Sequence, residues 1–580
     1  MAQPKNIELR MLLKQMSPSV KHSFYITFAI TIISLGSVVY MMQVYDRVVS
    51  TRSMGTLLSL TIAVLFAYAV AELLEMVRKK LLQRSTMLLE TDLSERVFRA
   101  IHRGSLMNMQ GVHVQQMKDL GMLRDYLHSQ GFMGLLELPT ALFFLLIMFI
   151  INPQMGYFSC LGLLIQGGVT FINATKVDPA LRKAQNSALE AMYYCFEIMR
   201  NSQVMHALGM SRNMENLWLA RQKRMMAEQA KASDTAGFVM SVSKFIGMTQ
   251  GSLMLGLGCL LTIYGLMSGG GAMLIVASII GGKALSPIMQ LLSSWKPMTE
   301  AKMCFDRIER LLNSLPPEHI GVPLPPPQGN LSVEHLVVAA PGQPFNILRG
   351  MTFSLAKGNI LVVMGANAAG KSTLTRALLG IWPSSGGKVR LDGADIFQWH
   401  KDHLGQYIGY LPQEVDLFDG TVAHNIARFG EPDLAQIEEL CKLINIHDVI
   451  MALPNGYLTD VGDEGVTFSG GQRQRIGLAR ALYGYPNYII MDEPNSNLDQ
   501  ENERFLIDAI RHMKARGATQ IIVTHRQSLV DEADYLMVMR SGTIQLFGTK
   551  DEVLASLRPP TAGDAQAAPA APALTAPSAS

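Results

Sequence analysis

The sequence has 580 residues and a net charge of +3, and only 17% of its residues are charged while 49% are apolar. An average soluble domain has roughly 25% charged residues, so this deficit indicates membrane segments and argues against a disordered or fibrous chain. The near-neutral charge provides no basic field, which argues against a nucleic-acid-binding protein. The five cysteines are scattered without metal-ligand spacing, so a disulfide scaffold is excluded.

Long stretches without charged residues or histidine predict membrane spans. Residues 138–175 and 245–282 contain none, and each is long enough for two helices of about 20 residues. Asn152-Pro153 and the Gly269–Gly271 run are turn signals within them. Two shorter stretches come earlier in the chain. Six stretches of this kind favour a membrane domain over the buried helices of a soluble core. The predicted spans are about 24–45, 53–72, 134–152, 155–174, 245–266 and 272–292.

Lysine and arginine gather on one side of these spans. They precede the first span and follow the second and the fourth, whereas the opposite connections are short and nearly uncharged. This asymmetry predicts that both termini are cytoplasmic. The inside loops, about 72–136 and 174–244, are expected to be helical, with an apolar residue at every fourth position from Leu89 to Ile101. No cleavable signal peptide is expected, because the first apolar stretch is too long and follows a polar leader.

The second half of the chain has a different composition. Residues 1–312 form the predicted transmembrane domain, and the proline-rich residues 313–330 predict a linker. From 331 to 557 short β-rich runs alternate with helical ones, which predicts an α/β domain. The tail, 558–580, is rich in alanine, proline, serine and threonine and is expected to be disordered.

A phosphate-binding loop follows the buried strand predicted at Ile360–Met364. The next nine residues read GANAAGKST, which matches GxxxxGK[ST] between a strand and a helix. Glycines let backbone N–H groups surround a phosphate, and the helix N-terminus adds a favourable field. Lys371 is expected to reach the β- and γ-phosphates, and the Ser372 hydroxyl to bind Mg²⁺. The predicted binding residues are Gly365, Ala366, Asn367, Ala368, Ala369, Gly370, Lys371, Ser372 and Thr373.

A second buried strand, Tyr488–Met491, ends in two carboxylates. Asp492 is expected to hold Mg²⁺ through water, and Glu493 to orient or deprotonate an attacking water. Two solvated acids at a strand end are the alternative interpretation, and the phosphate loop argues against it. Between the two motifs lies the signature Ser469, Gly470, Gly471 and Gln472, preceded by Phe468.

With this signature, residues 331–557 resemble the nucleotide-binding domain of ABC transporters. The resemblance implies an ATPase with ATP and Mg²⁺ as cofactors, and a signature that contacts the γ-phosphate bound on the other subunit. It also assigns Gln413 to the Q-loop, Asp499 to the D-loop and His525 to γ-phosphate sensing. The implied catalytic residues are Glu493, His525 and Gln413, and the implied metal ligands are Ser372, Gln413 and Asp492.

Six spans followed by one such domain resemble an ABC exporter half-transporter. The predicted fold is therefore a six-helix all-α transmembrane domain fused to an α/β P-loop nucleotide-binding domain. The run Met41–Val49, the run Ala207–Met210 and the segment at 271–296 resemble type I secretion ATPases. The most similar branch of these secretion ATPases exports alkaline proteases, lipases and haem-binding proteins. It usually has arginine where Lys283 stands and Asp-Leu-Pro-Trp where the sequence reads Glu137-Leu-Pro-Thr.

This resemblance implies export of unfolded proteins with an uncleaved C-terminal signal across the bacterial inner (plasma) membrane, driven by ATP hydrolysis. The implied partners are a second copy of the chain, a periplasmic membrane-fusion adaptor protein, a TolC-like outer-membrane channel, the secreted substrate and the lipid bilayer, without nucleic acid. An exporter of lipids, drugs or peptides is the alternative. Lys283 and Glu137 are expected either to snorkel to the membrane surface or to line the translocation cavity.

The stretch before the phosphate loop lacks one family feature. Exporter domains usually place an aromatic residue there to stack on adenine, and Ala340 stands at the matching position. Phe345 either takes this role or packs against the sheet. Weak discrimination between nucleotide bases is therefore expected.

Overall fold

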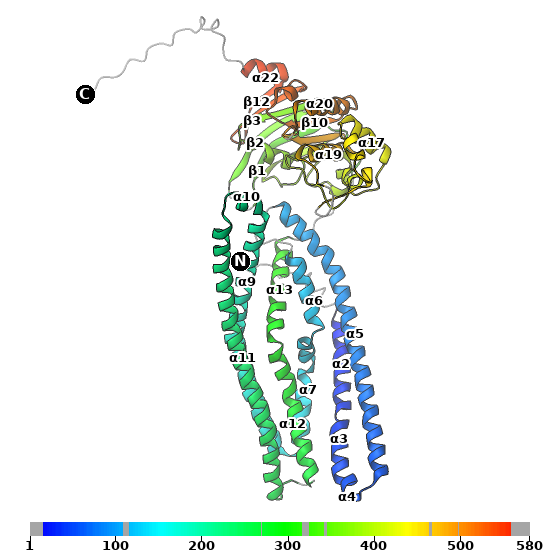
Figure 1. Cartoon of the computed structure of the whole chain (residues 1–580), viewed down its shortest axis with the longest axis vertical. Coiled ribbons are helices and arrows are strands. Elements are labelled where there is room, and N and C mark those ends of the chain that lie inside the picture. Colours follow the sequence, from blue (N-terminus) through cyan, green and yellow to red (C-terminus); the bar gives the residue numbers. More distant parts are fainter. Residues whose placement is uncertain are drawn as a thin grey trace, which may run out of the picture. The chain divides into compact units, whose positions relative to one another are not determined.

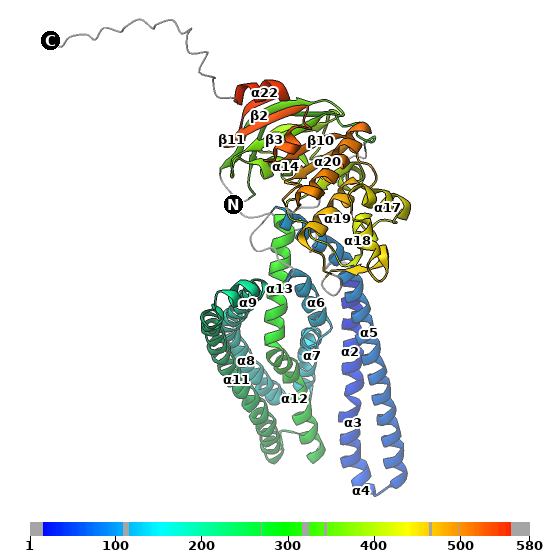
Figure 2. The same ribbon diagram turned by 45° about the horizontal axis from the view of Figure 1, so that its top comes forward.

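The computed structural model describes residues 16–107, 115–267, 270–315, 324–341, 345–462, 467–496 and 498–557. The chain forms two compact units, one of Met1–Ser105 with Gly111–Pro317 and one of Leu106–Gln110 with Glu318–Ser580. Figure 1 and Figure 2 show that the first unit is helical and that the second contains the strands. The tail predicted at 558–580 lies outside the described residues.

Long helices build the first unit (Figure 1). In chain order they are α2 (Ser17–Ser34), α3 (Gly36–Gln43), a π-helix (Val44–Val48), α4 (Val49–Thr51), α5 (Met54–Leu106), α6 (Gln115–Leu127), α7 (Gln130–Ile151), α8 (Pro153–Ile172), a second π-helix (Asn173–Val177), α9 (Asp178–Arg200), α10 (Ser202–Ala207), α11 (Ser211–Ile263), α12 (Gly270–Ser293) and α13 (Trp295–Ser314). The linker predicted from residue 313 begins inside α13, and its residues 316–323 lie outside the described part of the chain.

Within the described residues, six helical stretches are long and apolar enough to cross a membrane. They are Ser17–Thr51, Met54–Leu106, Gln115–Ile151, Pro153–Arg200, Ser211–Ile263 and Ala272–Ser293. Each predicted span overlaps one of them, although the span predicted to reach residue 266 ends at Ile263. The helices continue far past the predicted span ends, because the inside loops are helical as well.

Two helices, α5 and α11, have 53 residues each. At 1.5 Å per residue such a helix is about 80 Å long, whereas the hydrocarbon core of a bilayer is about 30 Å thick. Much of each helix therefore extends beyond the membrane. The apolar positions of α5 from Leu89 to Ile101 form one buried stripe in this extension.

The turn between α7 and α8 follows the sequence signal at Asn152-Pro153. The Asn152 side chain accepts a hydrogen bond from the backbone N–H of Gln154, and Pro153 occupies the first turn of α8. The Asn152 amide also donates to the carbonyl of Leu266 over 3.1 Å, which joins this turn to the one that follows α11. The predicted glycine turn lies partly outside the described residues, and α12 already begins at Gly270.

The second unit contains a six-stranded sheet in the order β12-β11-β3-β10-β9-β6. Its strands are β3 (Ile360–Gly365), β6 (Ile408–Leu411), β9 (Tyr488–Asp492), β10 (Thr519–Val523), β11 (Tyr535–Arg540) and β12 (Thr543–Thr549). All neighbours pair in parallel except β11 and β12. An antiparallel sheet, β2-β1-β4-β5, contains β1 (Leu331–Ala339), β2 (Asn346–Leu355), β4 (Gly386–Leu391) and β5 (Ala394–Asp395). The short strands β7 (Gly420–Thr421) and β8 (Asp460–Val461) form a separate pair.

The second unit also contains helices, some of which pack against the six-stranded sheet. In chain order they are α14 (Lys371–Leu378), α15 (Lys401–Leu404), α16 (Val422–Ile426), α17 (Leu434–Leu443), α18 (His447–Met451), α19 (Gly470–Leu482), α20 (Gln500–Ala515), α21 (Gln527–Val530) and α22 (Lys550–Leu557), with 3₁₀ turns at Gly405–Tyr407 and Gly456–Leu458. Successive side chains of β9 point to opposite faces of the sheet and therefore enter two different hydrophobic cores. Ile489 and Met491 pack with α19 and α20, whereas Tyr488 and Ile490 pack with α14 and the antiparallel sheet.

Candidate functional site

The carboxyl ends of three adjacent parallel strands place the predicted site residues at one edge of the sheet. In the register, Val523 of β10 lies opposite Asp492 of β9 and opposite Val363 of β3. The phosphate loop follows β3, the carboxylate pair ends β9, and His525 follows β10. Ligands of open α/β sheets bind at this edge.

The phosphate loop leads directly into helix α14, which begins at Lys371. Gly370, the residue before the helix, has φ +98, a conformation that favours glycine. A Cβ at Gly370 would lie 2.9 Å from Leu348 Cδ2, and one at Gly365 would lie 2.4 Å from the carbonyl oxygen of Met539. Both ends of the loop therefore need glycine, and the N–H groups at the start of α14 are left for an anion, as the motif predicts.

The side chain of the loop lysine, Lys371, is buried next to the phosphate loop. Lys371 is 8% exposed, and its Nζ lies 2.5 Å from the carbonyl oxygen of Gly365 and 2.8 Å from Nε2 of His525. Burial lowers the pKa of Lys371 below its ordinary value. The structure thus brings together Lys371, which the loop motif predicts to reach the β- and γ-phosphates, and His525, which the resemblance assigns to γ-phosphate sensing, although they are 154 positions apart.

The metal-ligand candidates meet at the end of β9. Asp492 is 6% exposed; burial raises its pKa, and a hydrogen bond from Ser372 opposes that shift. Ser372, Asp492 and Gln413 offer hydroxyl, carboxylate and amide oxygens, the ligand type that Mg²⁺ prefers. Together with the loop, this donor set fits a nucleotide bound with Mg²⁺.

Glu493 is held next to this donor set in an uncommon backbone conformation. Its φ is +48, which non-glycine residues adopt rarely and which is found at functional sites. Its backbone N–H donates to the carbonyl of Val523, and its Oε2 accepts a hydrogen bond of 3.0 Å from Gln413 Nε2. The carboxylate expected to activate water is thus linked to the Q-loop glutamine.

The signature forms the start of helix α19. Ser469 is its N-cap and forms a capping box with Gln472, so that Gly470 and Gly471 lie in the first turn. In the described part of the chain, no hydrogen bond joins these four residues to the phosphate loop of the same chain. This separation agrees with a signature that acts on another subunit.

Sequence reasoning missed the residues that connect the signature helix to the sheet edge where the predicted site residues lie. Gln474 Nε2 donates to the carbonyl of Pro494 over 3.2 Å. Arg475 Nη1 donates to Asn502 Oδ1 over 3.1 Å, and Asn502 is held by Asp499, the N-cap of α20. Hydrogen bonds from Asn502 lower the pKa of Asp499. The polar run after the signature was a weak signal, since polar residues on a helix are usually solvated.

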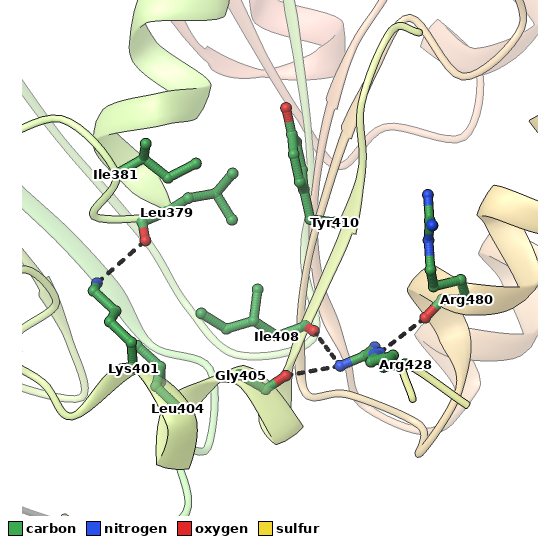
Figure 3. A pocket seen from close by; sticks show the side chains of 9 residues that line it. All are labelled: Leu379, Ile381, Lys401, Leu404, Gly405, Ile408, Tyr410, Arg428 and Arg480. Carbon is green, nitrogen blue, oxygen red and sulfur yellow. Dashed lines mark hydrogen bonds between the residues drawn. The ribbon is translucent and has the colours of Figure 1, made fainter. Parts of the chain in front are cut away.

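A pocket of about 330 Å³ is lined by nine residues of the second unit (Figure 3). Within it the Arg428 guanidinium donates to the carbonyl oxygens of Gly405, Ile408, Arg480 and Ala481. Burial lowers the pKa of Arg428 to about 10. The lining residues are Leu379, Ile381, Lys401, Leu404, Gly405, Ile408, Tyr410, Arg428 and Arg480. Arg428 therefore joins its own segment to two others, Gly405–Ile408 and Arg480–Ala481.

Glu137 and Lys283, the two charged residues that the sequence singled out in the membrane unit, each have a polar partner. Glu137 accepts hydrogen bonds from Arg78, which is 3% exposed. Lys283 donates to Ser34 Oγ over 3.1 Å. The sequence did not indicate either partner, because both lie on other helices.

Two family models match the chain, the ABC transporter transmembrane region over residues 23–282 and the ABC transporter over residues 348–496. The type I secretion system ATP-binding protein PrsD of Rhizobium meliloti is 38% identical over 90% of this chain and 90% of that protein. The leukotoxin translocation ATP-binding protein LktB of a Pasteurella haemolytica-like species is 27% identical over 91% of this chain and 75% of that protein. A bacterial Atm1-family ABC exporter with ATP bound has the same fold, with a TM-score of 0.79, 20% identity and coverage of 93% of this chain and 96% of that chain.

Proposed function

Because this chain belongs to the ABC transporters of type I secretion systems, ATPases coupled to protein export, we propose that two copies form the working transporter and share two composite ATP sites. In each site, Gly365–Thr373 of one copy bind the phosphates, and Ser372, Gln413 and Asp492 hold Mg²⁺. The signature of the other copy, Ser469–Gln472, closes the site. Bound Mg²⁺ would supply positive charge to the phosphates, while Glu493 would position the attacking water and His525 would contact the γ-phosphate.

The observation that carries this proposal is the meeting of Lys371, His525, Asp492 and Glu493 at one sheet edge. Among the residues that the structure describes, the signature of the same chain makes no hydrogen bond to the loop. A single chain thus contains both the phosphate loop and the signature, but it does not bring them together in one site. Two copies arranged head to tail would complete both sites.

The cargo and the partners are part of the same proposal. The relatives are named for type I secretion and for leukotoxin translocation, which supports protein export over export of lipids, drugs or peptides. We propose that the chain works in the bacterial inner membrane with both termini cytoplasmic. Its substrates would be unfolded proteins with an uncleaved C-terminal signal, received by a periplasmic membrane-fusion adaptor and a TolC-like outer-membrane channel.

Mixed dimers of two variants test the shared sites. When a Lys371→Ala chain pairs with a Ser469→Ala chain, both lesions fall in one site and the other site stays intact. A matched control pairs a chain carrying both substitutions with an unmodified chain, so that each site has one lesion. We expect phosphate release from the first dimer and little from the control, measured on purified dimers in nanodiscs. Equal activity of the two arrangements would contradict the proposal.

A further inference from the structure

A buried glutamine joins the signature helix to the segment that carries Glu493. Gln474 lies in the second turn of α19, whose N-cap is Ser469, and it is 1% exposed. Its Nε2 donates to the carbonyl oxygen of Pro494 over 3.2 Å. Within the part of the chain that the structure describes, no other hydrogen bond reaches this oxygen, and Gln474 Oε1 has no partner. The Gln474 side chain is therefore bound to the residue that follows Glu493.

The backbone of Glu493 needs contacts that hold it. Its φ of +48 is one that non-glycine residues adopt rarely, and such a conformation persists only where the surrounding structure fixes it. The Glu493 N–H donates to the carbonyl of Val523 over 2.9 Å. The hydrogen bond from Gln474 to Pro494 fixes the next residue along the chain. The direction of the Glu493 carboxylate thus depends on both contacts.

The same turn is also bound to the segment that carries His525. Thr524 Oγ1 donates to Asn495 Oδ1 over 3.1 Å, and both side chains are buried. His525 follows Thr524 directly, and its Nε2 lies 2.8 Å from Lys371 Nζ. The turn after Glu493 is therefore bound both to the signature helix and to the segment that follows β10.

We propose that Gln474 is a positioning residue for ATP hydrolysis, which holds the Glu493 carboxylate in place from the signature helix. This inference rests on the proposed function, in which the signature of one copy closes the ATP site of the other. Helix α19, with 13 residues, then serves both sites. Its N-terminus contacts the nucleotide held by the partner copy, while Gln474 supports the carboxylate in the site of its own copy. A shift of the signature at one nucleotide therefore reaches the group that activates water in the other site.

Gln474→Met removes the amide donor and keeps a side chain of similar length. We expect ATP turnover of the full-length protein in nanodiscs to fall by about tenfold to a hundredfold, because a small displacement of a reacting group can slow a reaction by this much. The dissociation constant of ATP should stay unchanged. Gln474→Asn, which keeps the amide but is one methylene shorter, is a second variant in case the first fails to fold. Unmodified turnover in either folded variant would overturn the inference.

Gln520→Met is the matched control. Gln520 lies at the amino end of β10 and is also fully buried. Its Nε2 likewise donates to a backbone carbonyl, that of Ile510, over 2.8 Å, and its Oε1 has no partner among the described residues. This substitution removes a similar hydrogen bond far along the chain from Glu493. It should leave turnover at the unmodified rate, and an equal loss in both variants would overturn the inference by indicating a general effect on the fold.

Mixed dimers show which site Gln474 serves. One copy carries Lys371→Ala, so that the remaining site uses the phosphate loop and Glu493 of the other copy. Gln474→Met should lower the remaining turnover when it lies on the copy with the working Glu493. It should have little effect on the copy that supplies the signature. Loss in the second arrangement, or equal loss in both, would overturn the inference. The Lys371 and Ser469 dimers described above contain no Gln474 substitution, so a failure of the shared sites is recognised separately.

Discussion

At the scale of single residues, Glu493 combines a carboxylate at the sheet edge with a backbone conformation that non-glycine residues rarely adopt. We expect Glu493→Gln to lower ATP turnover by about 100-fold or more while ATP still binds, because the amide keeps the shape but cannot accept the proton. Phosphate release and retention of labelled ATP by the full-length protein measure the two effects.

Glu501→Gln is the matched control for that variant, since Glu501 is exposed in the first turn of α20. It should hydrolyse ATP at the unmodified rate. Turnover near the unmodified rate in Glu493→Gln itself would remove Glu493 from the catalytic assignment.

The adenine contact is a second prediction at this scale. Ala340 packs against the core, and Phe345 is 57% exposed. Stacking on an aromatic ring contributes about 1–3 kcal/mol per base, so its absence leaves binding to the phosphate and Mg²⁺ contacts. We expect ATP and GTP affinities within about tenfold, or about 1.4 kcal/mol, in competition binding assays.

Two variants sharpen this test. Ala340→Tyr should tighten ATP binding if the tyrosine ring reaches the base. Strong selectivity for ATP in the unmodified protein that disappears in Phe345→Ala would refute weak discrimination and identify Phe345 as the stacking residue.

At the scale of elements, Arg428 joins its own backbone segment to two others that are distant in the chain, Gly405–Ile408 and Arg480–Ala481. Its four carbonyl acceptors lie after α15, at the start of β6 and at the end of α19. A lysine cannot reproduce the planar fork of donors. We expect Arg428→Lys to lower the free energy of local unfolding by about 2–4 kcal/mol, since buried carbonyls lose their partners.

Hydrogen–deuterium exchange of the full chain measures this effect in peptides from β6 and α19. Arg504→Lys, at an exposed position of α20, is the control and should exchange like the unmodified protein. Unchanged protection in Arg428→Lys would mean that the four hydrogen bonds contribute little.

At the scale of the whole molecule, the distribution of lysine and arginine predicts which ends of the spans face the cytoplasm. Single cysteines in a cysteine-free background test it. Thr51→Cys, between the first two spans, should react with a membrane-impermeant maleimide in spheroplasts. Ser202→Cys, at the start of α10, should react only after the membrane is opened. The reverse pattern would invert the proposed orientation.

The sequence by itself determined the six spans, the α/β domain and the nucleotide motifs. Each of these depends on a contiguous signal, such as a charge-free stretch or the run Gly365–Thr373 between a strand and a helix. A short turn signal at Asn152-Pro153 was likewise sufficient to place the break between α7 and α8, because the cap is formed by neighbouring residues. The family comparisons confirm the fold class and the protein-export function.

Only the tertiary structure decided which distant side chains become partners. Gln413 and Glu493 are 80 residues apart, Arg428 and Arg480 are 52 apart, and Gln166 and Ser243 are 77 apart. None of these pairs has a local sequence signal, since a polar residue on a helix or loop is usually solvated. Strand register and helix packing bring the partners together, and burial then gives their hydrogen bonds an energetic importance that the same residues would lack in water.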